Sequence, residues 1–364
     1  MYIVTYILDI AALLYLIGVL HSSPALNIYR KKPFLVGIIL TIIVILAEAG
    51  TVFTSNGGLN LRNINILCNI LGFALTPMIP LAITLIFDGK IFRAHKFLLV
   101  PTLINIVVTV LSPLFKFIFY VDANNHYLRG DYFFIFIAVY IANLLLLIIS
   151  TLETGKKYNY PIKWKLVALS IFTIIGTSIQ LINPSVYSSW HCITLALLLY
   201  FLLLSEFDSS FDTLTGFYNR AVFNKAAKQM TDSKAFSIIL LDIDDFKKVN
   251  DTYGHDYGDT VIKTVAAIIR KSFNKHYTCY RFGGDEFSIM SNEADREKIE
   301  YQLRTMISNF AEMRENGSLL PTVSYGYSIF PGGEKLDFNK IFKEADEQMY
   351  KFKEIHKSDA IQEK

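Results

Sequence analysis

The chain has 364 residues, of which 52% are hydrophobic and 18% are charged, and its formal net charge is +3. Soluble globular proteins contain about 45–50% apolar and about 25% charged residues. Residues 1–205 contain 13 Lys and Arg and 6 Asp and Glu, whereas residues 206–364 contain 22 and 26. This division excludes a single water-soluble fold, a disordered chain and a disulfide-rich secreted domain.

Seven apolar stretches in residues 1–205 have the length of membrane spans, since about 20 residues cross a bilayer core. We therefore expect an all-α bundle of seven transmembrane helices. Pro77 and Pro80 interrupt the third stretch, and Pro usually kinks a membrane helix. The expected spans are residues 2–21, 34–54, 64–87, 97–120, 132–152, 164–183 and 187–205.

The loops between these stretches differ in their basic residues, which fix orientation in a membrane. The alternate loops carry Arg62 and Arg129, and Lys116 lies near the outer end of the fourth stretch. We therefore expect a multi-pass protein of the lipid bilayer with its N-terminus outside and residues 206–364 in the cytoplasm. The loops expected inside carry Arg30, Lys31, Lys32, Lys90, Arg93, Lys96, Lys156, Lys157, Lys163 and Lys165.

Two carboxylates, Asp9 and Glu48, lie inside the expected spans. Intramembrane carboxylates are costly and often mark a ligand or ion site. Glu48 is therefore a candidate for intramembrane sensing. The alternative is that both side chains bond neighbouring helices or lie near an interface. The outer loops are short, so an external signal would act within the bundle or through the lipid.

Residues 206–364 have the pattern of a mixed helix and strand domain that follows a short linker. Its net charge is −4 without a basic stripe, so we expect no nucleic-acid partner. The order of elements predicts an α+β sandwich with helices packed on one sheet. The expected strands are residues 236–241, 278–281, 287–290 and 322–330. One helix is expected to begin after residue 216 and another at residue 246. The remaining expected helices are residues 259–273, 294–314 and 337–354.

Two acidic clusters stand out in this domain. Asp242 and Asp244 end the first buried strand, and Asp285 and Glu286 follow a Gly-Gly turn between two strands. Two such turns side by side suit Mg²⁺, which takes one or two carboxylates together with phosphates and water. Lys247 lies at the start of the next helix, where backbone amides can bind a phosphate. Each motif by itself is more often a plain hairpin turn or a helix cap.

Residues 212–357 resemble a GGDEF domain, the family of bacterial diguanylate cyclases. The resemblance is carried by Arg281-Phe282-Gly283-Gly284-Asp285-Glu286-Phe287, by the segment from Asp242 to Asp259, by Asp212-Thr213-Leu214-Thr215-Gly216 and by Val323-Ser324-Tyr325-Gly326. It implies a seven-helix transmembrane sensor domain at 1–205, a linker at 206–211, an α+β, cyclase/polymerase-palm-like GGDEF domain at 212–357 and a tail at 358–364.

The family condenses two GTP into cyclic di-GMP with loss of two pyrophosphates. The resemblance implies GTP as substrate and Mg²⁺ as cofactor, with Mn²⁺ as the alternative. It implies catalytic roles for Asp285, Lys247 and Glu286, and Asp285 would accept the proton of the attacking 3′-hydroxyl. The implied metal ligands are Asp242, the Ile243 carbonyl, Asp285 and Glu286. The implied substrate-binding residues are Phe246, Lys247, Asn250, His255, Asp259, Gly283, Gly284, Lys353 and Lys357.

Three positions depart from the family pattern. Lys357 stands where the family usually has Arg, so the bidentate contact with a phosphate is lost. Asn274 and Tyr277 stand where many members carry the Arg and Asp of a product-inhibition site. We therefore expect no product inhibition through that site and somewhat weaker triphosphate binding.

Each GGDEF domain would activate only its own GTP, so two domains must meet face to face. The resemblance therefore implies a homodimer formed through the GGDEF domains and the membrane bundle, with activity set by geometry at residues 203–212. It also implies a bacterial cell (inner) membrane location. The alternative is a degenerate GGDEF domain acting as a GTP or dinucleotide receptor. A transporter or channel is disfavoured because the spans lack paired charges.

Overall fold

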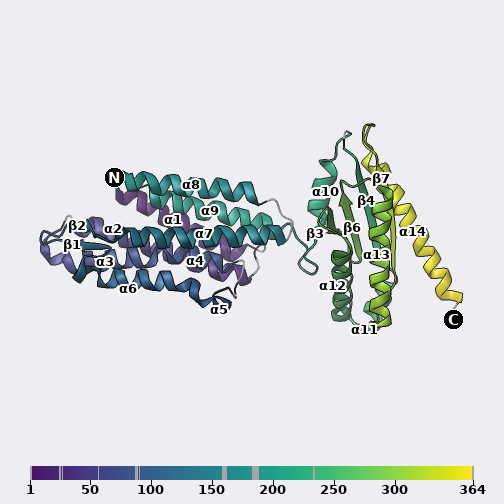
Figure 1. Ribbon diagram of the computed structural model, residues 1–364, viewed down its shortest axis with the longest axis horizontal. Coiled ribbons are helices and arrows are strands. Elements are labelled where there is room, and N and C mark those ends of the chain that lie inside the picture. Colours follow the sequence, from purple (N-terminus) through teal and green to yellow (C-terminus); the bar gives the residue numbers. More distant parts are fainter. Residues whose placement is uncertain are drawn as a thin grey trace. The chain divides into compact units, whose positions relative to one another are not determined.

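The computed structural model describes residues 2–23, 26, 28–55, 57–86, 89, 91–157, 162–182, 188–232 and 234–362. The chain divides into two compact units, Met1–Asp208 and Ser209–Lys364 (Figure 1). Lys90 and the last two residues of the expected tail lie outside the described residues.

The described residues of the first unit form helices and one short hairpin (Figure 1). Its elements are α1 (Tyr2–Ser22), α2 (Ile28–Ser55), η1 (Leu59–Leu61), α3 (Arg62–Leu75), α4 (Met78–Thr84), α5 (Ile91–Ala94), η2 (Lys96–Leu99), α6 (Val100–Phe115), β1 (Phe119–Val121), β2 (Tyr127–Arg129), α7 (Phe133–Lys157), α8 (Lys163–Ile182) and α9 (Ser189–Asp208).

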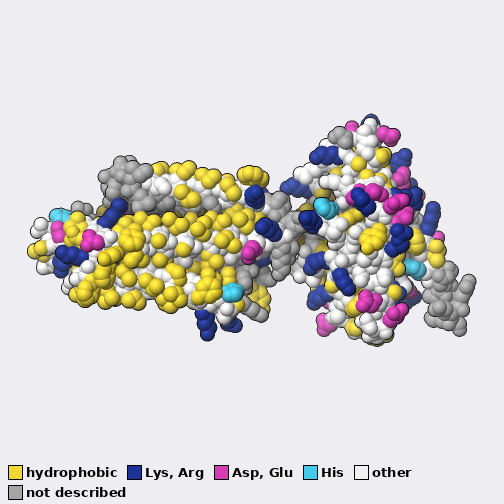
Figure 2. Space-filling model, viewed as in Figure 1, with side chains coloured by type: hydrophobic (Ala, Val, Ile, Leu, Met, Phe, Trp, Pro, Cys, Tyr) yellow, Lys and Arg dark blue, Asp and Glu magenta, His cyan; other side chains and the backbone are white. Residues whose placement is uncertain are grey.

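Six helical segments among the described residues are long and apolar enough to cross a membrane. The sixth stretch of the sequence analysis forms α8, which is not among these six, and several of its side chains lie outside the described part. Large apolar side chains cover the outside of the unit, and Figure 2 shows this apolar surface along the helices with charges near their ends. The six segments are Ile3–Ser22, Tyr29–Ser55, Leu59–Thr84, Lys96–Phe115, Phe133–Lys156 and Ser189–Asp208.

The third span is divided at Pro77, as the sequence predicts, into α3 and α4. Buried amides satisfy carbonyls near the break: Asn143 Nδ2 donates to Pro77 O (2.7 Å) and Asn105 Nδ2 to Phe73 O (2.9 Å). A broken membrane helix requires such partners for its freed carbonyls. These asparagines therefore have a structural role in the bundle.

The fourth span is shorter than its expected range of residues 97–120. The helix α6 ends at Phe115, because Lys116 adopts a left-handed conformation (φ 56°). The apolar residues that follow enter the strand β1, which pairs with β2. Phe119 is fully buried and stacks on Phe73 at 5.6 Å between ring centroids. Hydropathy alone does not distinguish this buried strand from the end of a span.

The second unit is an α+β domain with one five-stranded sheet in the order β3-β5-β6-β4-β7 (Figure 1). Only the pair β3–β5 is parallel. The elements are β3 (Tyr218–Asn219), α10 (Arg220–Lys228), β4 (Phe236–Ile243), α11 (Phe246–Tyr253), α12 (His255–Ser272), β5 (Tyr277–Arg281), β6 (Glu286–Ser291), α13 (Arg296–Glu315), β7 (Val323–Phe330) and α14 (Phe338–Gln362).

Every residue of β4, which lies between β6 and β7, is buried, because helices cover both faces of the sheet. Ile239 and Leu241 pack in one core with α12 and α13. On the opposite face Phe236 stacks on Phe338 of α14, with 6.0 Å between ring centroids. The sequence predicts helices on a sheet, and the structure places them on both sides.

Candidate active site

The two acidic segments lie on neighbouring strands. In the β4–β6 ladder Asp242 is opposite Glu286. The Ile243 amide donates to the Asp285 carbonyl, with 3.3 Å between nitrogen and oxygen. Strand β6 begins directly after the Gly283-Gly284 turn, so the fold places this turn beside the C-terminal end of β4.

Asp242 is buried and paired with Lys353 of α14. Lys353 Nζ lies 2.5 Å from Asp242 Oδ1. Burial raises the pKa of Asp242 and outweighs the lowering by Lys353, while the neighbouring carboxylates Asp285 and Asp244 add to the rise. Burial lowers the pKa of Lys353, but its bond to Asp242 and the surrounding negative charges give a net rise. The Lys353 ammonium thus pairs with Asp242 Oδ1, an oxygen that is also a candidate ligand for a divalent cation.

Glu286 faces the same acidic group from β6. Burial raises its pKa, and the charges of Asp242 and Asp285 raise it further. A Cβ at Gly283 would lie 2.3 Å from Glu286 Oε2 and 2.9 Å from Glu286 Cβ. Neither glycine of the turn has a positive φ. The requirement for glycine at position 283 therefore comes from its close contact with Glu286, and not from its backbone conformation.

Asp244 has a different role from Asp242. Its carboxylate accepts hydrogen bonds from Thr322 Oγ1 (2.7 Å), Ser324 Oγ (2.7 Å) and His356 Nδ1 (2.8 Å). Its amide also donates to the Thr322 carbonyl (2.9 Å). By its sequence motif Asp244 is grouped with the acidic cluster expected to bind a metal. In the structure this carboxylate joins β4 to β7 and α14.

The helices α11 and α12 carry the residues expected to contact the base and phosphates. Asn250 is held against Gly258, and its Oδ1 is buried with no hydrogen-bond partner among the described residues. Phe246 is half-buried at the start of α11. The remaining side chains of this group are exposed, and they are Lys247, His255 and Asp259.

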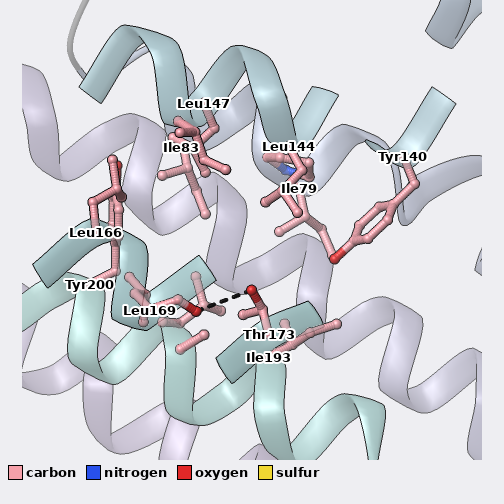
Figure 3. Close-up of a pocket in the computed structure, with 14 residues that line it drawn as sticks. Ile79, Ile83, Tyr140, Leu144, Leu147, Leu166, Leu169, Thr173, Ile193 and Tyr200 are labelled. Atoms are coloured by element: carbon pink, nitrogen blue, oxygen red, sulfur yellow. Dashed lines mark hydrogen bonds between the residues drawn. The ribbon is translucent and has the colours of Figure 1, made fainter. Parts of the chain in front are cut away.

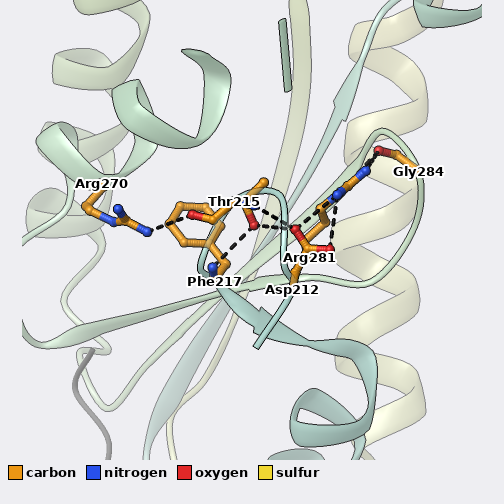
Figure 4. A network of polar contacts seen from close by, with 6 residues as sticks. All are labelled: Asp212, Thr215, Phe217, Arg270, Arg281 and Gly284. Carbon is orange, nitrogen blue, oxygen red and sulfur yellow. Dashed lines mark hydrogen bonds and ion pairs between the residues drawn. The ribbon is translucent and has the colours of Figure 1, made fainter. Parts of the chain in front are cut away.

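Arg281 joins the acidic turn to the beginning of the domain (Figure 4). Its Nη1 lies 3.0 and 3.1 Å from the two carboxylate oxygens of Asp212. Its Nη2 and Nε donate to the Gly284 carbonyl at 2.7 and 3.2 Å. Burial raises the pKa of Asp212, but the bonds from Thr215 and Arg281 give a net lowering. The sequence analysis names both residues as motif positions and gives neither a role.

Three further positions of the sequence analysis are Lys357, Tyr277 and Asn274. Lys357 belongs to α14, but its side chain lies outside the described residues. Tyr277 is buried in β5, and its hydroxyl has no hydrogen-bond partner in the described part of the chain. Asn274 caps a turn, its side-chain oxygen accepting from the His276 amide. The absence of product inhibition stays a prediction.

The donors at the end of β4 fit a hard cation. No group of three His, Cys, Asp or Glu side chains suited to a metal ion occurs among the described residues. The site offers Asp242, Asp285 and the Ile243 carbonyl, all oxygen donors. Mg²⁺ in nucleotide sites takes one or two carboxylates and completes its shell with phosphates and water. Oxygen donors also suit Mn²⁺. The residues present therefore fit either ion shared with a nucleotide.

Polar side chains gather between α1, α2 and α9 in the first unit. Glu48 accepts a hydrogen bond from Tyr6 Oη (3.4 Å) and one from Trp190 Nε1. Asp9 is buried and bonds His191 Nδ1 at 2.7 Å. Glu48 and Asp9 therefore join α9 to α2 and α1, which is the structural alternative that the sequence analysis leaves open. A sensing role for Glu48 stays a prediction.

A cavity of about 70 Å³ lies between α4, α7, α8 and α9 (Figure 3). Its lining is apolar apart from hydroxyl groups. Thr173 Oγ1 donates to the Leu169 carbonyl (3.2 Å), and Tyr200 is bonded to Thr151 (2.7 Å). No charged side chain lines it among the described residues.

The last turn of α9 is bonded to two other helices. Arg30 Nη1 of α2 lies 2.5 Å from Asp208 Oδ1, and its guanidinium carbon lies 5.0 Å from the centre of the Phe207 ring. Lys165 of α8 pairs with Glu206. The Arg30–Asp208 pair is the more buried of the two. It therefore fixes α9 at the residue that precedes the second unit.

Residues 209–359 match the family model described as "Diguanylate cyclase, GGDEF domain". The uncharacterized protein YhcK of Bacillus subtilis is 31% identical, over 41% of this chain and 44% of its own. The diguanylate cyclase DgcZ of Escherichia coli is 34% identical, over 44% of this chain and 56% of its own. The chain thus spans about half the length of these curated relatives.

Among solved structures, the GGDEF domain of DgcB from Caulobacter crescentus in complex with c-di-GMP is 27% identical. It matches 40% of this chain and 91% of that chain with a TM-score of 0.35. Residues 209–359 thus match a GGDEF domain, and the acidic turn between β5 and β6 lies within the matched range. This domain follows a unit with several apolar helices.

Proposed function

We propose that this protein is a membrane-anchored diguanylate cyclase that condenses two GTP into cyclic di-GMP and two pyrophosphates. The observation that carries the proposal is the position of Asp242 beside the Gly283–Glu286 turn, in a domain that matches the family model. Asp242 is buried in β4, and the half-buried Glu286 is opposite it in β6, so the sheet fixes these carboxylates as positioned phosphoryl chemistry requires.

Asp285 is the proposed general base. It would accept the proton of the 3′-hydroxyl that attacks the α-phosphorus of the other GTP, and pyrophosphate would leave. Lys353 and Lys247 would bind the triphosphate and offset its negative charge. Because a cation bound at Asp242 would compete with the Lys353 ammonium for the same carboxylate oxygen, the bond between Lys353 and Asp242 would open when substrate and cation bind. Glu286, with its raised pKa, would complete the acidic group.

Asp242, the Ile243 carbonyl and Asp285 would hold Mg²⁺ or Mn²⁺, with Glu286 assisting at a second position. When bound, the ion neutralises charge on the phosphates and orients them for in-line attack. Gly283 and Gly284 would let the phosphates approach the turn backbone. Lys357 keeps a positive charge near the end of α14 and would add to triphosphate binding.

Guanine recognition would fall to α11 and α12. The buried Oδ1 of Asn250 has no hydrogen-bond partner among the described residues, and a guanine N–H would supply one. Asp259 is an acceptor for the remaining N–H groups, which adenine lacks. Phe246 and His255 would line the same wall. This donor and acceptor pattern supports GTP over ATP.

Two GGDEF domains must face each other, since each brings one GTP to the reaction. We therefore propose a homodimer that is held by the membrane bundle, which raises the effective concentration of the domains. The basic loops support an N-terminus outside the bacterial inner membrane and a GGDEF domain in the cytoplasm. The segment 203–212 would transmit the state of the bundle, and Glu48 is a candidate for sensing within it.

The test is product formation by the full chain reconstituted in nanodiscs with GTP and Mg²⁺. Chromatography should show cyclic di-GMP from the unchanged protein and none from Asp285→Ala. The control variant Glu312→Ala, at an exposed position of α13, should also form cyclic di-GMP. GTP binding without any product would favour a degenerate receptor. If the protein neither binds GTP nor forms a product, the proposal is contradicted.

A further inference from the structure

The helix α14 lies beside β7 (Figure 1), and side-chain contacts join the two elements. Glu344 bonds Ser328 (2.8 Å), Gln348 accepts from the Tyr327 amide (3.2 Å), and Phe352 stacks on Tyr325 at 4.8 Å. A Cβ at Gly326 would lie 2.1 Å from the Ala345 carbonyl. These contacts set the path of the helix before it reaches the active site.

Near its C-terminal end, α14 carries two side chains to two carboxylates, Asp242 in β4 and Asp244 directly after it. Lys353 pairs with Asp242, and three residues later His356 Nδ1 lies 2.8 Å from Asp244 Oδ2 and 3.2 Å from Ser324 Oγ. Residues three apart lie on one helix face. Since an ionised carboxylate only accepts, the His356 Nδ1–H is the donor in its bond to Asp244.

Asp244 and Ser324 give His356 a fixed anchor. Ser324 is opposite Asp242 in the β4–β7 ladder and donates to Asp244. Thr322 donates to the other oxygen of Asp244, so the carboxylate cannot rotate freely. The anchor is therefore independent of Lys353, although it lies on the same strands.

We propose that His356 is a positioning residue that holds the last turns of α14 against Asp244, so that Lys353 stays in reach of the triphosphate after substrate separates it from Asp242. This proposal rests on the proposed function. Without His356, the release of Lys353 from Asp242 would free this end of the helix. The Lys353 ammonium would then lose its fixed position when GTP binds.

The experiment uses full-length protein in nanodiscs and compares His356→Ala, His356→Asn and His356→Gln. The Asn amide nitrogen can take the place of Nδ1, whereas the Gln amide nitrogen lies farther along the side chain. We expect His356→Ala and His356→Gln to raise the KM for GTP about tenfold, the effect of one hydrogen bond to a charged group. The kcat should change less than twofold, and His356→Asn should restore KM. Exposed Glu354→Ala serves as the control.

A second readout does not depend on turnover. Hydrogen exchange of amides 350–356 should be faster in His356→Ala than in the unchanged protein, and His356→Asn should restore it. Unchanged KM and unchanged exchange in His356→Ala would overturn the inference, as would equal behaviour of the Asn and Gln variants. If the unchanged protein makes no product, the proposed function fails and the exchange rates alone decide the role of His356.

Discussion

The guanidinium of Arg281 bonds both carboxylate oxygens of Asp212 while it holds the carbonyl of Gly284. Asp212 lies four residues after Asp208, where α9 ends, and Gly284 belongs to the acidic turn. One side chain thus connects the entry to the GGDEF domain with the turn that carries Asp285. Through Arg281, a shift of the entry segment around Asp212 would therefore displace the turn directly, with no helix between them.

Arg281→Lys should lower cyclic di-GMP formation by about tenfold or more, because Lys cannot bond Asp212 and Gly284 together. The fold should persist, since the sheet and both cores remain. Initial rates measured with saturating GTP check this, with circular dichroism as the control for folding. Full activity in Arg281→Lys would show that the connection is dispensable.

The lowered pKa of Asp212 gives a pH dependence of stability. A carboxyl whose folded pKa lies below its unfolded value stabilises the protein above about pH 4, and this contribution fades as pH falls through the folded pKa. Asp212→Asn should therefore cost about 1 kcal/mol at pH 7. The difference in melting temperature from the unchanged protein should persist at pH 5 and shrink toward pH 3. A difference that grows on acidification would contradict the assignment.

Gly283→Ala should displace Glu286, because the added Cβ would lie within 3 Å of that side chain. Displacing a group in the site by about 1 Å can cost on the order of 100-fold in rate. The part of the effect that comes from displacing the carboxylate should disappear in a Glu286→Ala background, whereas the close contact with the Cβ of residue 286 (2.9 Å) remains. Additive losses in the double variant would mean that Gly283 acts through the substrate instead.

Arg30→Gln should loosen the last turn of α9 by removing its bond to Asp208 and its contact with Phe207. Since the pair is mostly buried, the local cost should be about 2 kcal/mol. Amides 204–208 should exchange faster, and the rate of cyclic di-GMP formation should change. Lys165→Gln is the matched control, because its pair with Glu206 is more exposed and should cost less than about 1 kcal/mol. Equal effects of the two variants would argue against a special role for Arg30.

The sequence predicts the division of the chain, most of the helices and the strands of the sheet, because their apolar patterns are long. It misses β3, which has only two residues and no period to detect. It extends the fourth span into β1, because a buried strand and a membrane span are equally apolar. It predicts helices packed on the sheet, and the structure adds that they cover both faces of β4, in which all eight residues are buried.

The candidate site is predictable as a set of motifs and not as a set of contacts. The acidic turn and the end of β4 are readable because their residues are contiguous. The bonds of Asp244 to Thr322, Ser324 and His356 join segments about 80 to 110 residues apart and leave no local signal. For the same reason the sequence assigns Lys353 to the phosphates without showing that it pairs with Asp242.

The central claim is that Asp242 and Asp285 hold one divalent cation beneath GTP. The most direct measurement is Mn²⁺ binding followed by electron paramagnetic resonance in full-length protein with a non-reactive GTP analogue. The unchanged protein should bind Mn²⁺ only with the nucleotide, and Asp242→Asn and Asp285→Asn should each abolish this binding. Mn²⁺ held equally well in both variants would contradict the account.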